Sequence, residues 1–170
     1  MQQFRKRYSG INVNHFIDPA YFIKPGVNRA KIREQIAAVI FPGDKVGLQI
    51  HGWKSLVRAS GVLFRDGPTF WGQNLSAKQC AFDCGHEIPV NIYSQEELRR
   101  IFATGIQILR DEGFDRPRAF SAGGWLSSTN VQEAAAAEGL ERDYSAVPPS
   151  LIYQRLRSYP LFGWVNNLWQ

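Results

Sequence analysis

Short runs suited to β-strands alternate along this chain with segments suited to amphipathic helices, and turn residues separate the two. The strand-like runs occupy residues 11–17, 46–50, 117–120 and 143–147. Apolar residues recur at helical spacing in residues 29–40, 94–112 and 131–138. Alternation of this kind is typical of parallel sheets and barrels that are covered by helices. The sequence therefore predicts a fold of the α/β class.

Capping residues mark where the predicted helices begin and end. Ser94 with Glu97, and Asn130 with Glu133, have the spacing of a capping box, in which two side chains satisfy backbone N–H groups at a helix start. The other predicted boundaries are Asn28 as an N-terminal cap and Gly43, Gly113 and Gly139 as stops. These signals make the helix after Ser94 the clearest element of the chain.

Length and charge favour one domain without a nucleic-acid partner. The 170 residues, 44% of them apolar, suffice for a single core. The net charge of +5 is dispersed, and no basic block exceeds Arg5-Lys6-Arg7, whereas nucleic-acid binding calls for a clustered patch. No apolar run approaches the roughly 18 residues of a membrane span, and no signal-type apolar core follows the basic N-terminus. Localisation stays open.

Residues 61–89 lack any sustained period and predict a long loop. Gly, Pro, Asn and aromatic residues interrupt this segment throughout. Loops of this size within compact domains are usually functional or disordered. The aromatic content favours the functional interpretation.

Residues with chemical potential follow the predicted strands. In parallel sheets and barrels, ligands gather at the carboxyl ends of the strands. The residues at these positions are His15, Asp18, His51, Gly52, Trp53, Gly123, Gly124 and Trp125. His51 suits a metal ligand, a general acid or base, or a core histidine satisfied by backbone. Trp53 and Trp125 suit either stacking against sugar rings or plugging the end of a barrel.

The loop contains a second group of polar residues. Cys80, Cys84 and His86 form a C-x3-C-x-H pattern, whose thiolates and imidazole suit zinc, with His51 as a possible fourth ligand. Because most zinc modules use C-x2-C pairs, free thiols or a local disulfide are the alternatives. Asp83 and His86, with Glu87, are candidates either to reach an active site or to hydrogen-bond the loop to itself.

Two stretches give the chain a resemblance to a known family. KVGLQIHGW at 45–53 resembles a strand motif of the form E-V-G-L-H-I-H-P/G-W, and RPRAFSAGGW at 116–125 resembles R-P-x-x-F-R-A-G-G-W. Together with the segment 83–90 and the helix 94–112, they make the chain similar to bacterial polysaccharide deacetylases of the NodB-homology superfamily.

The resemblance implies a fold, a reaction and a set of site residues. It implies a distorted (β/α) barrel that hydrolyses N-acetyl groups of amino-sugar polymers with a divalent metal, often zinc, held by an aspartate and two histidines. His51 matches one metal histidine, with Asp83 and His86 as catalytic candidates. His15, Trp53, Trp125, Gly123 and Gly124 are the candidate saccharide-binding residues.

Several positions depart from that pattern. Gln49 replaces the second histidine and Ser121 replaces the arginine that steadies the base. The acidic motif is expected on a strand before Ile11, where no Asp or Glu occurs, and no histidine follows His86. We therefore expect residues 1–170 to form one incomplete deacetylase-like domain that lacks the first strand and the C-terminal elements. An impaired hydrolase, a non-catalytic carbohydrate-binding domain and a zinc-stabilised module are the three hypotheses.

Overall fold

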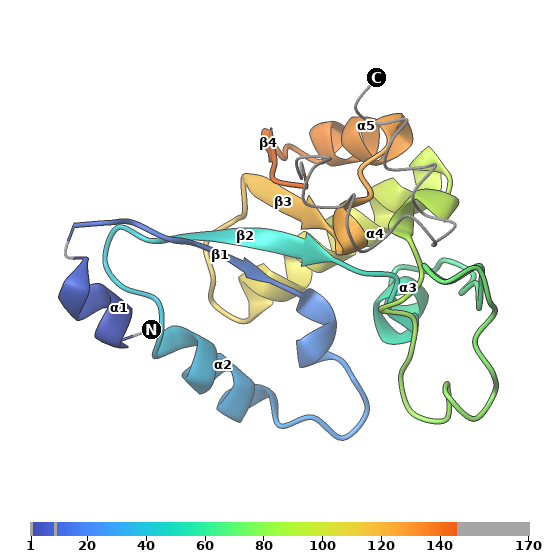
Figure 1. Cartoon of the computed structure of the whole chain (residues 1–170), viewed down its shortest axis with the longest axis horizontal. Coiled ribbons are helices and arrows are strands. Elements are labelled where there is room, and N and C mark those ends of the chain that lie inside the picture. Colours follow the sequence, from blue (N-terminus) through green and yellow to red (C-terminus); the bar gives the residue numbers. More distant parts are fainter. Residues whose placement is uncertain (1, 9, 146–170) are drawn as a thin grey trace.

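The computed structural model describes residues 2–8 and 10–145 and has the predicted α/β architecture (Figure 1). Four strands, β1 (Asn14–Ile17), β2 (Lys45–Ile50), β3 (Ala119–Ala122) and β4 (Arg142–Asp143), form a sheet in the order β1-β2-β3-β4. All three neighbouring pairs are parallel. Because parallel strands require crossover connections, helical segments lie between consecutive strands, and the carboxyl ends of the strands share one edge of the sheet.

Helix α1 precedes β1, and the other helices lie between consecutive strands. The helices are α1 (Gln2–Arg7), α2 (Arg29–Ala37), α3 (Lys54–Ala59), α4 (Gln95–Asp111) and α5 (Thr129–Ala137), with short 3₁₀-helices η1 (Pro19–Phe22), η2 (Val90–Ile92) and η3 (Gly123–Trp125). Within the described residues, no helix is both long and apolar enough to cross a membrane.

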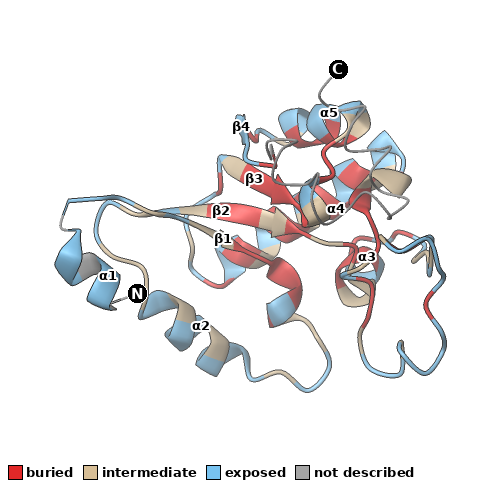
Figure 2. Cartoon of the chain, viewed as in Figure 1, coloured by how far each residue is buried: buried red, intermediate tan, exposed pale blue. Residues whose placement is uncertain are grey.

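The core lies between β2, β3 and helix α4 (Figure 2). Leu48 and Ile50 of β2 have no exposed surface. Gly105 of α4 lies so close to them that an added Cβ would approach both side chains to 3.3 Å. Dense packing at this contact sets the distance between helix and sheet, so α4 anchors one face of β2.

The predicted boundaries of α4 are confirmed. The Ser94 side chain accepts a hydrogen bond from the Glu97 backbone N–H, and the Glu97 carboxylate accepts one from the Ser94 N–H. Burial alone would raise the pKa of Glu97, but the bonds from Ser94 and Arg65 outweigh it, so this pKa is lowered. Gly113 follows the helix with a φ of +87°. Asn28 likewise caps α2, by accepting from Lys31 N.

The second predicted capping box is wrong. The N-terminal cap of α5 is Ser128, two residues before Asn130. The Asn130 side-chain amide donates to the backbone carbonyls of Asn91 and Tyr93, at 3.3 and 2.8 Å. Asn130 therefore joins α5 to the segment before α4 and does not begin the helix.

Other element bounds differ from those predicted. The third strand begins at Ala119, two residues later than expected, and the first begins at Asn14. Helix α2 ends at Ala37, short of residue 40. The run 143–147 contributes only Asp143 to β4 and Tyr144 and Ser145 after it, and its last two residues lie outside the described part of the chain. Helix α3, which follows β2, was not predicted at all.

The face of the sheet opposite α4 carries a contact between its two edges. Phe16 of β1 and Tyr144, which follows β4, have ring centroids 5.2 Å apart. The edge strands of a flat four-stranded sheet lie about 14 Å apart, so these rings meet across β2 and β3. Gly47 of β2 makes room for them, because a Cβ there would lie 2.6 Å from the Phe16 ring.

Residues 61–89 contain no helix or strand, as predicted, but specific bonds attach this loop to the domain. Arg65 donates to both oxygens of Glu97 at 3.0 Å. A disulfide joins Cys80 to Cys84. Near its end, the loop runs so close to β2 that a Cβ on Gly85 would lie 2.2 Å from the carbonyl oxygen of Gly52. The loop is therefore built against the carboxyl end of β2.

Candidate functional site

Asp18 and His51 meet at the carboxyl edge of the sheet. Asp18 directly follows β1, and His51 directly follows β2. The parallel register places Ile17 beside Leu48, so both chains leave the sheet at neighbouring positions. His51 Nδ1 lies 2.9 Å from Asp18 Oδ2, which is hydrogen-bond distance. The strand pairing thus brings together a carboxylate and an imidazole that are 33 residues apart.

The Asp18 carboxylate accepts three hydrogen bonds and is only 4% exposed. Oδ1 accepts from the Ala20 N–H at 3.0 Å, which caps η1. Oδ2 accepts from the Trp53 Nε1–H, also at 2.9 Å, beside its contact with His51. A buried carboxylate with this many donors holds a fixed orientation. Asp18 is therefore the positioning group of the site.

The other nitrogen of His51, Nε2, has no hydrogen-bond partner among the described residues. A carboxylate can only accept, so a neutral His51 would carry its proton on Nδ1, facing Asp18, and would present a lone pair at Nε2. The side chain is 26% exposed. Gly123 after β3 flanks the ring, and a Cβ there would lie 2.4 Å from His51 Cδ2. The arrangement suits a general base or a metal ligand.

Trp53 lies beside the Asp18–His51 pair and is itself surrounded by other side chains. Its ring stacks on that of His86, with centroids 5.0 Å apart and an interplanar angle of 30°. Lys24 Nζ lies 3.0 Å from the Trp53 ring centroid and 4.4 Å from that of Tyr21. Burial lowers the pKa of Lys24, and nearby Asp83 and Asp18 raise it only in part. Trp53 thus contacts protein groups and positions Asp18 through its indole N–H.

Gln49 and Ser121, the two substituted motif positions, lie side by side in the sheet. They are register partners on β2 and β3. Because side chains alternate along a strand, Gln49 faces the same side as His51 and opposite to Leu48 and Ile50. An amide and a hydroxyl therefore lie on the same face of the sheet as the imidazole, where they offer hydrogen-bonding groups and no charge.

His15 does not join this group, which corrects its predicted place at a strand end. It lies within β1, and its Nε2 is 3.0 Å from Asp44 Oδ2. Asp44 immediately precedes β2, whereas His51 follows it. His15 therefore belongs to the amino-terminal end of the sheet, across from the site.

Asp83 and His86 lie near the site in different roles. Asp83 Oδ1 accepts from Ser55 N at 3.0 Å and Oδ2 from Ser55 Oγ at 2.8 Å, so this carboxylate caps the start of α3. His86 is half-exposed and reaches the site only against the Trp53 ring. The Cys80–Cys84 disulfide joins the two sulfurs to each other, so in this structure they are not the thiolate ligands of a zinc module.

Gly124 and Trp125 shape the end of β3. Both have left-handed backbones, with φ of 64° and 59°, and this is unusual for a residue as large as tryptophan. A Cβ on Gly124 would lie 2.6 Å from the Phe70 ring, so the long loop packs there. The Trp125 side chain is 51% exposed. Of the two predicted platforms, Trp125 is the one that offers an open ring.

The set of metal-ligating side chains is smaller than the resemblance implies. Among residues 2–8 and 10–145, no group of three or more His, Cys, Asp or Glu side chains is placed to hold a metal ion. Asp18 and His51 supply two ligand types that suit zinc, and the amide of Gln49 is a weak third. Zinc at this site therefore stays a prediction.

Sequence reasoning named Asp18 as a strand-end residue but left it out of the site. Its signal was the position directly after the first described strand, ahead of Pro19.

Comparison with known proteins adds no relative to this picture. No model of a protein family matches the chain, and no curated protein or solved structure matches it.

Proposed function

We propose that this chain is a hydrolase domain of the polysaccharide deacetylase type, which removes N-acetyl groups from an amino-sugar polymer. The observation that carries the proposal is the Asp18–His51 pair at the carboxyl ends of β1 and β2. The resemblance implies an aspartate from the first strand beside the histidine of the VGLQIHGW strand. Asp18, directly after β1, offers a counterpart for the acid that the resemblance implies before Ile11.

The fold supports the same proposal. Strands of a (β/α) barrel pair in chain order with helices outside, and the sheet here has the order β1-β2-β3-β4. The contact between Phe16 and Tyr144 across the two central strands is what a strongly curved sheet would bring about. We propose that the sheet is part of a distorted barrel whose inner face carries Gln49, His51 and Ser121.

The chemistry follows from the hydrogen bonds of the pair. His51 Nε2 would take a proton from the water that attacks the acetamide carbonyl, and Asp18 would stabilise the resulting imidazolium through Nδ1–H. The same proton would then pass to the departing amine. Gln49 and Ser121 would donate hydrogen bonds to the substrate.

Acetate release tests this function directly. N-acetylglucosamine oligomers are incubated with the protein at high concentration, with and without added zinc, and acetate and the metal content are measured. We expect acetate in proportion to enzyme. Absence of acetate under both conditions would contradict the proposal.

A second candidate is carbohydrate binding without catalysis, and the exposed left-handed Trp125 favours it. Trp125→Asn replaces the ring with a residue that tolerates a positive φ. We expect the fold to remain and the affinity for N-acetylglucosamine oligomers to fall about five- to tenfold, because stacking on the ring is lost. Isothermal titration calorimetry measures this, and an unchanged affinity would exclude Trp125 as a platform. Binding by a protein that releases no acetate would favour this second function.

A further inference from the structure

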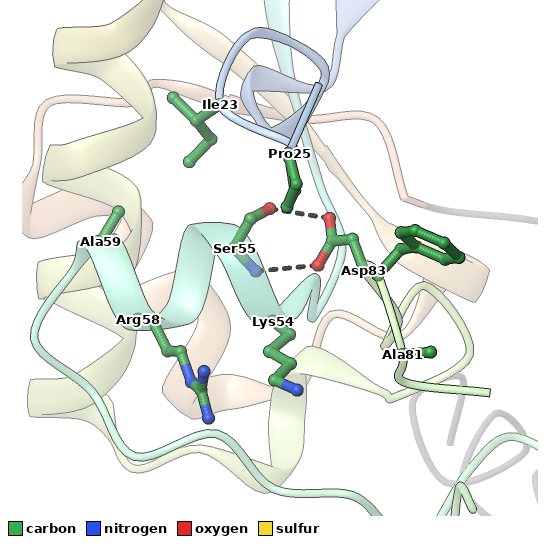
Figure 3. Close-up of a pocket in the computed structure, with 9 residues that line it drawn as sticks. Ile23, Pro25, Lys54, Ser55, Arg58, Ala59, Ala81 and Asp83 are labelled. Atoms are coloured by element: carbon green, nitrogen blue, oxygen red, sulfur yellow. Dashed lines mark hydrogen bonds between the residues drawn. The ribbon is translucent and has the colours of Figure 1, made fainter. Parts of the chain in front are cut away.

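A separate pocket of about 450 Å³ opens against α3, the helix that directly follows Trp53 (Figure 3). Its volume lies within the roughly 300–1,000 Å³ that is usual for small-molecule sites. Three segments line it: Ile23 and Pro25 after η1, one side of α3, and residues 81–83 of the long loop. Of the residues predicted as functional, only Asp83 lines this pocket, and both of its carboxylate oxygens accept from Ser55.

The pocket presents positive charge. Lys54 and Arg58 lie one turn apart and extend from the same side of α3 (Figure 3). The Arg58 guanidinium has no partner among the described residues, and Lys54 Nζ has only a long 3.4 Å contact with the Cys80 carbonyl. The single carboxylate, Asp83, already accepts from Ser55 through both oxygens. Two cations are therefore left for an external anion.

The loop wall adds an apolar surface and a covalent constraint. Phe82, on this wall, is 86% exposed, which is unusual for a phenylalanine. The Cys80–Cys84 disulfide closes the segment that carries Phe82 and Asp83. An exposed ring beside cations suits a ligand with an apolar sugar face and a negative group.

Lys24 and Trp53, which do not line the pocket themselves, connect it to the candidate site. Lys54 follows Trp53 directly, and Lys24 lies in sequence between the pocket residues Ile23 and Pro25. Lys24 contacts the Trp53 ring and interacts with both Asp83 and Asp18. A ligand in the pocket would therefore lie close to a sugar bound at Asp18 and His51.

We propose that this pocket binds a carboxylate or phosphate group on a sugar that neighbours the sugar held at Asp18–His51. Lys54 and Arg58 bind the anion, and Phe82 contacts the sugar ring. The role as a substrate subsite rests on the proposed hydrolase function, whereas anion binding by the pocket does not.

Binding of single sugars tests the inference independently of hydrolysis. The probes are N-acetylglucosamine 6-phosphate, glucuronate and neutral N-acetylglucosamine, titrated by calorimetry at low salt. We expect at least one anionic sugar to bind about tenfold or more tightly than the neutral one. The relative affinities of the two anionic probes identify phosphate or carboxylate as the preferred group.

Arg58→Glu and Arg33→Glu form the matched pair of variants, since both change the net charge equally and Arg33 lies on α2. We expect Arg58→Glu to abolish the preference for the anionic sugar and Arg33→Glu to retain it. Reduction of the disulfide, or Cys80→Ser with Cys84→Ser, should weaken anionic binding several-fold. His51→Gln should keep it, because the pocket does not include His51.

Three results would overturn the inference: equal binding of neutral and anionic sugars, equal loss in both arginine variants, or tighter binding of inorganic phosphate than of either sugar. Anionic binding that depends on Arg58 in a protein that releases no acetate would support the pocket and count against the hydrolase. Acetate release without any preference for anionic sugars would support the hydrolase and count against the pocket.

Discussion

Asp18→Asn should both destabilise the protein and abolish hydrolysis. The carboxylate accepts from Ala20, His51 and Trp53 while it is almost wholly buried. An asparagine amide has only one acceptor oxygen, so at least one N–H group must face its NH₂ donor. Such a mismatch costs about 1–3 kcal/mol in the free energy of unfolding. Urea unfolding followed by tryptophan fluorescence measures it.

The catalytic effect has a separate cause. If the amide NH₂ faces His51, the imidazole must present a lone pair at Nδ1 and carry its proton on Nε2, where it can no longer act as a base. We expect acetate release to fall by about 10²–10⁴-fold. Asp66→Asn is the matched control at an exposed position, with an expected change within about 0.5 kcal/mol and normal activity. Equal behaviour of the two variants would refute the role of Asp18.

Gly85→Ala should be among the most damaging changes in the long loop. Gly85 has a φ of +102°, and an added Cβ would lie 2.2 Å from the Gly52 carbonyl oxygen and 2.8 Å from the Phe64 ring. Backbone strain and the forced separation from Gly52 together should cost more than about 3 kcal/mol in unfolding free energy. Because Gly52 lies between His51 and Trp53, hydrolysis should fall as well.

Gly61→Ala separates these two contributions. Gly61 also has a positive φ, +66°, but nothing lies within 4 Å of its added Cβ. This variant should lose only about 1–2 kcal/mol, which is the cost of the left-handed backbone. Thermal and urea unfolding of both proteins provide the comparison. A Gly85→Ala protein no less stable than Gly61→Ala would show that the loop is not held against β2 as described.

Local signals account for the elements that the sequence predicted well. Helix α4 carries its capping box and its stop within its own sequence, and both form as expected. Helix α3 escaped prediction because it has six residues and its cap comes from Asp83, 28 residues away from Ser55. Asn130 was wrongly predicted as a helix cap for a similar reason, because its partners are backbone carbonyls that lie before α4. Contacts distant in the chain decide these cases.

The candidate site shows the same division. His51 and Trp53 could be found from one strand and the glycine between them. Asp18 could be named as a strand-end residue, but its contact with His51 depends on the register of β1 against β2. The pocket beside α3 needs three segments at once, and no pattern within one of them indicates it. Sequence therefore identified parts of the site, and the sheet register brought the parts together.

The most direct test of the account compares His51→Gln with His15→Gln in acetate release from N-acetylglucosamine oligomers. Both substitutions remove an imidazole that contacts a carboxylate, Asp18 in one case and Asp44 in the other. Of the two histidines, only His51 lies at the carboxyl edge of the sheet, and its Nε2 has no partner among the described residues. We expect His51→Gln to lose about 100-fold or more in rate and His15→Gln to keep the rate of the unaltered protein. Equal rates for the two variants would contradict it.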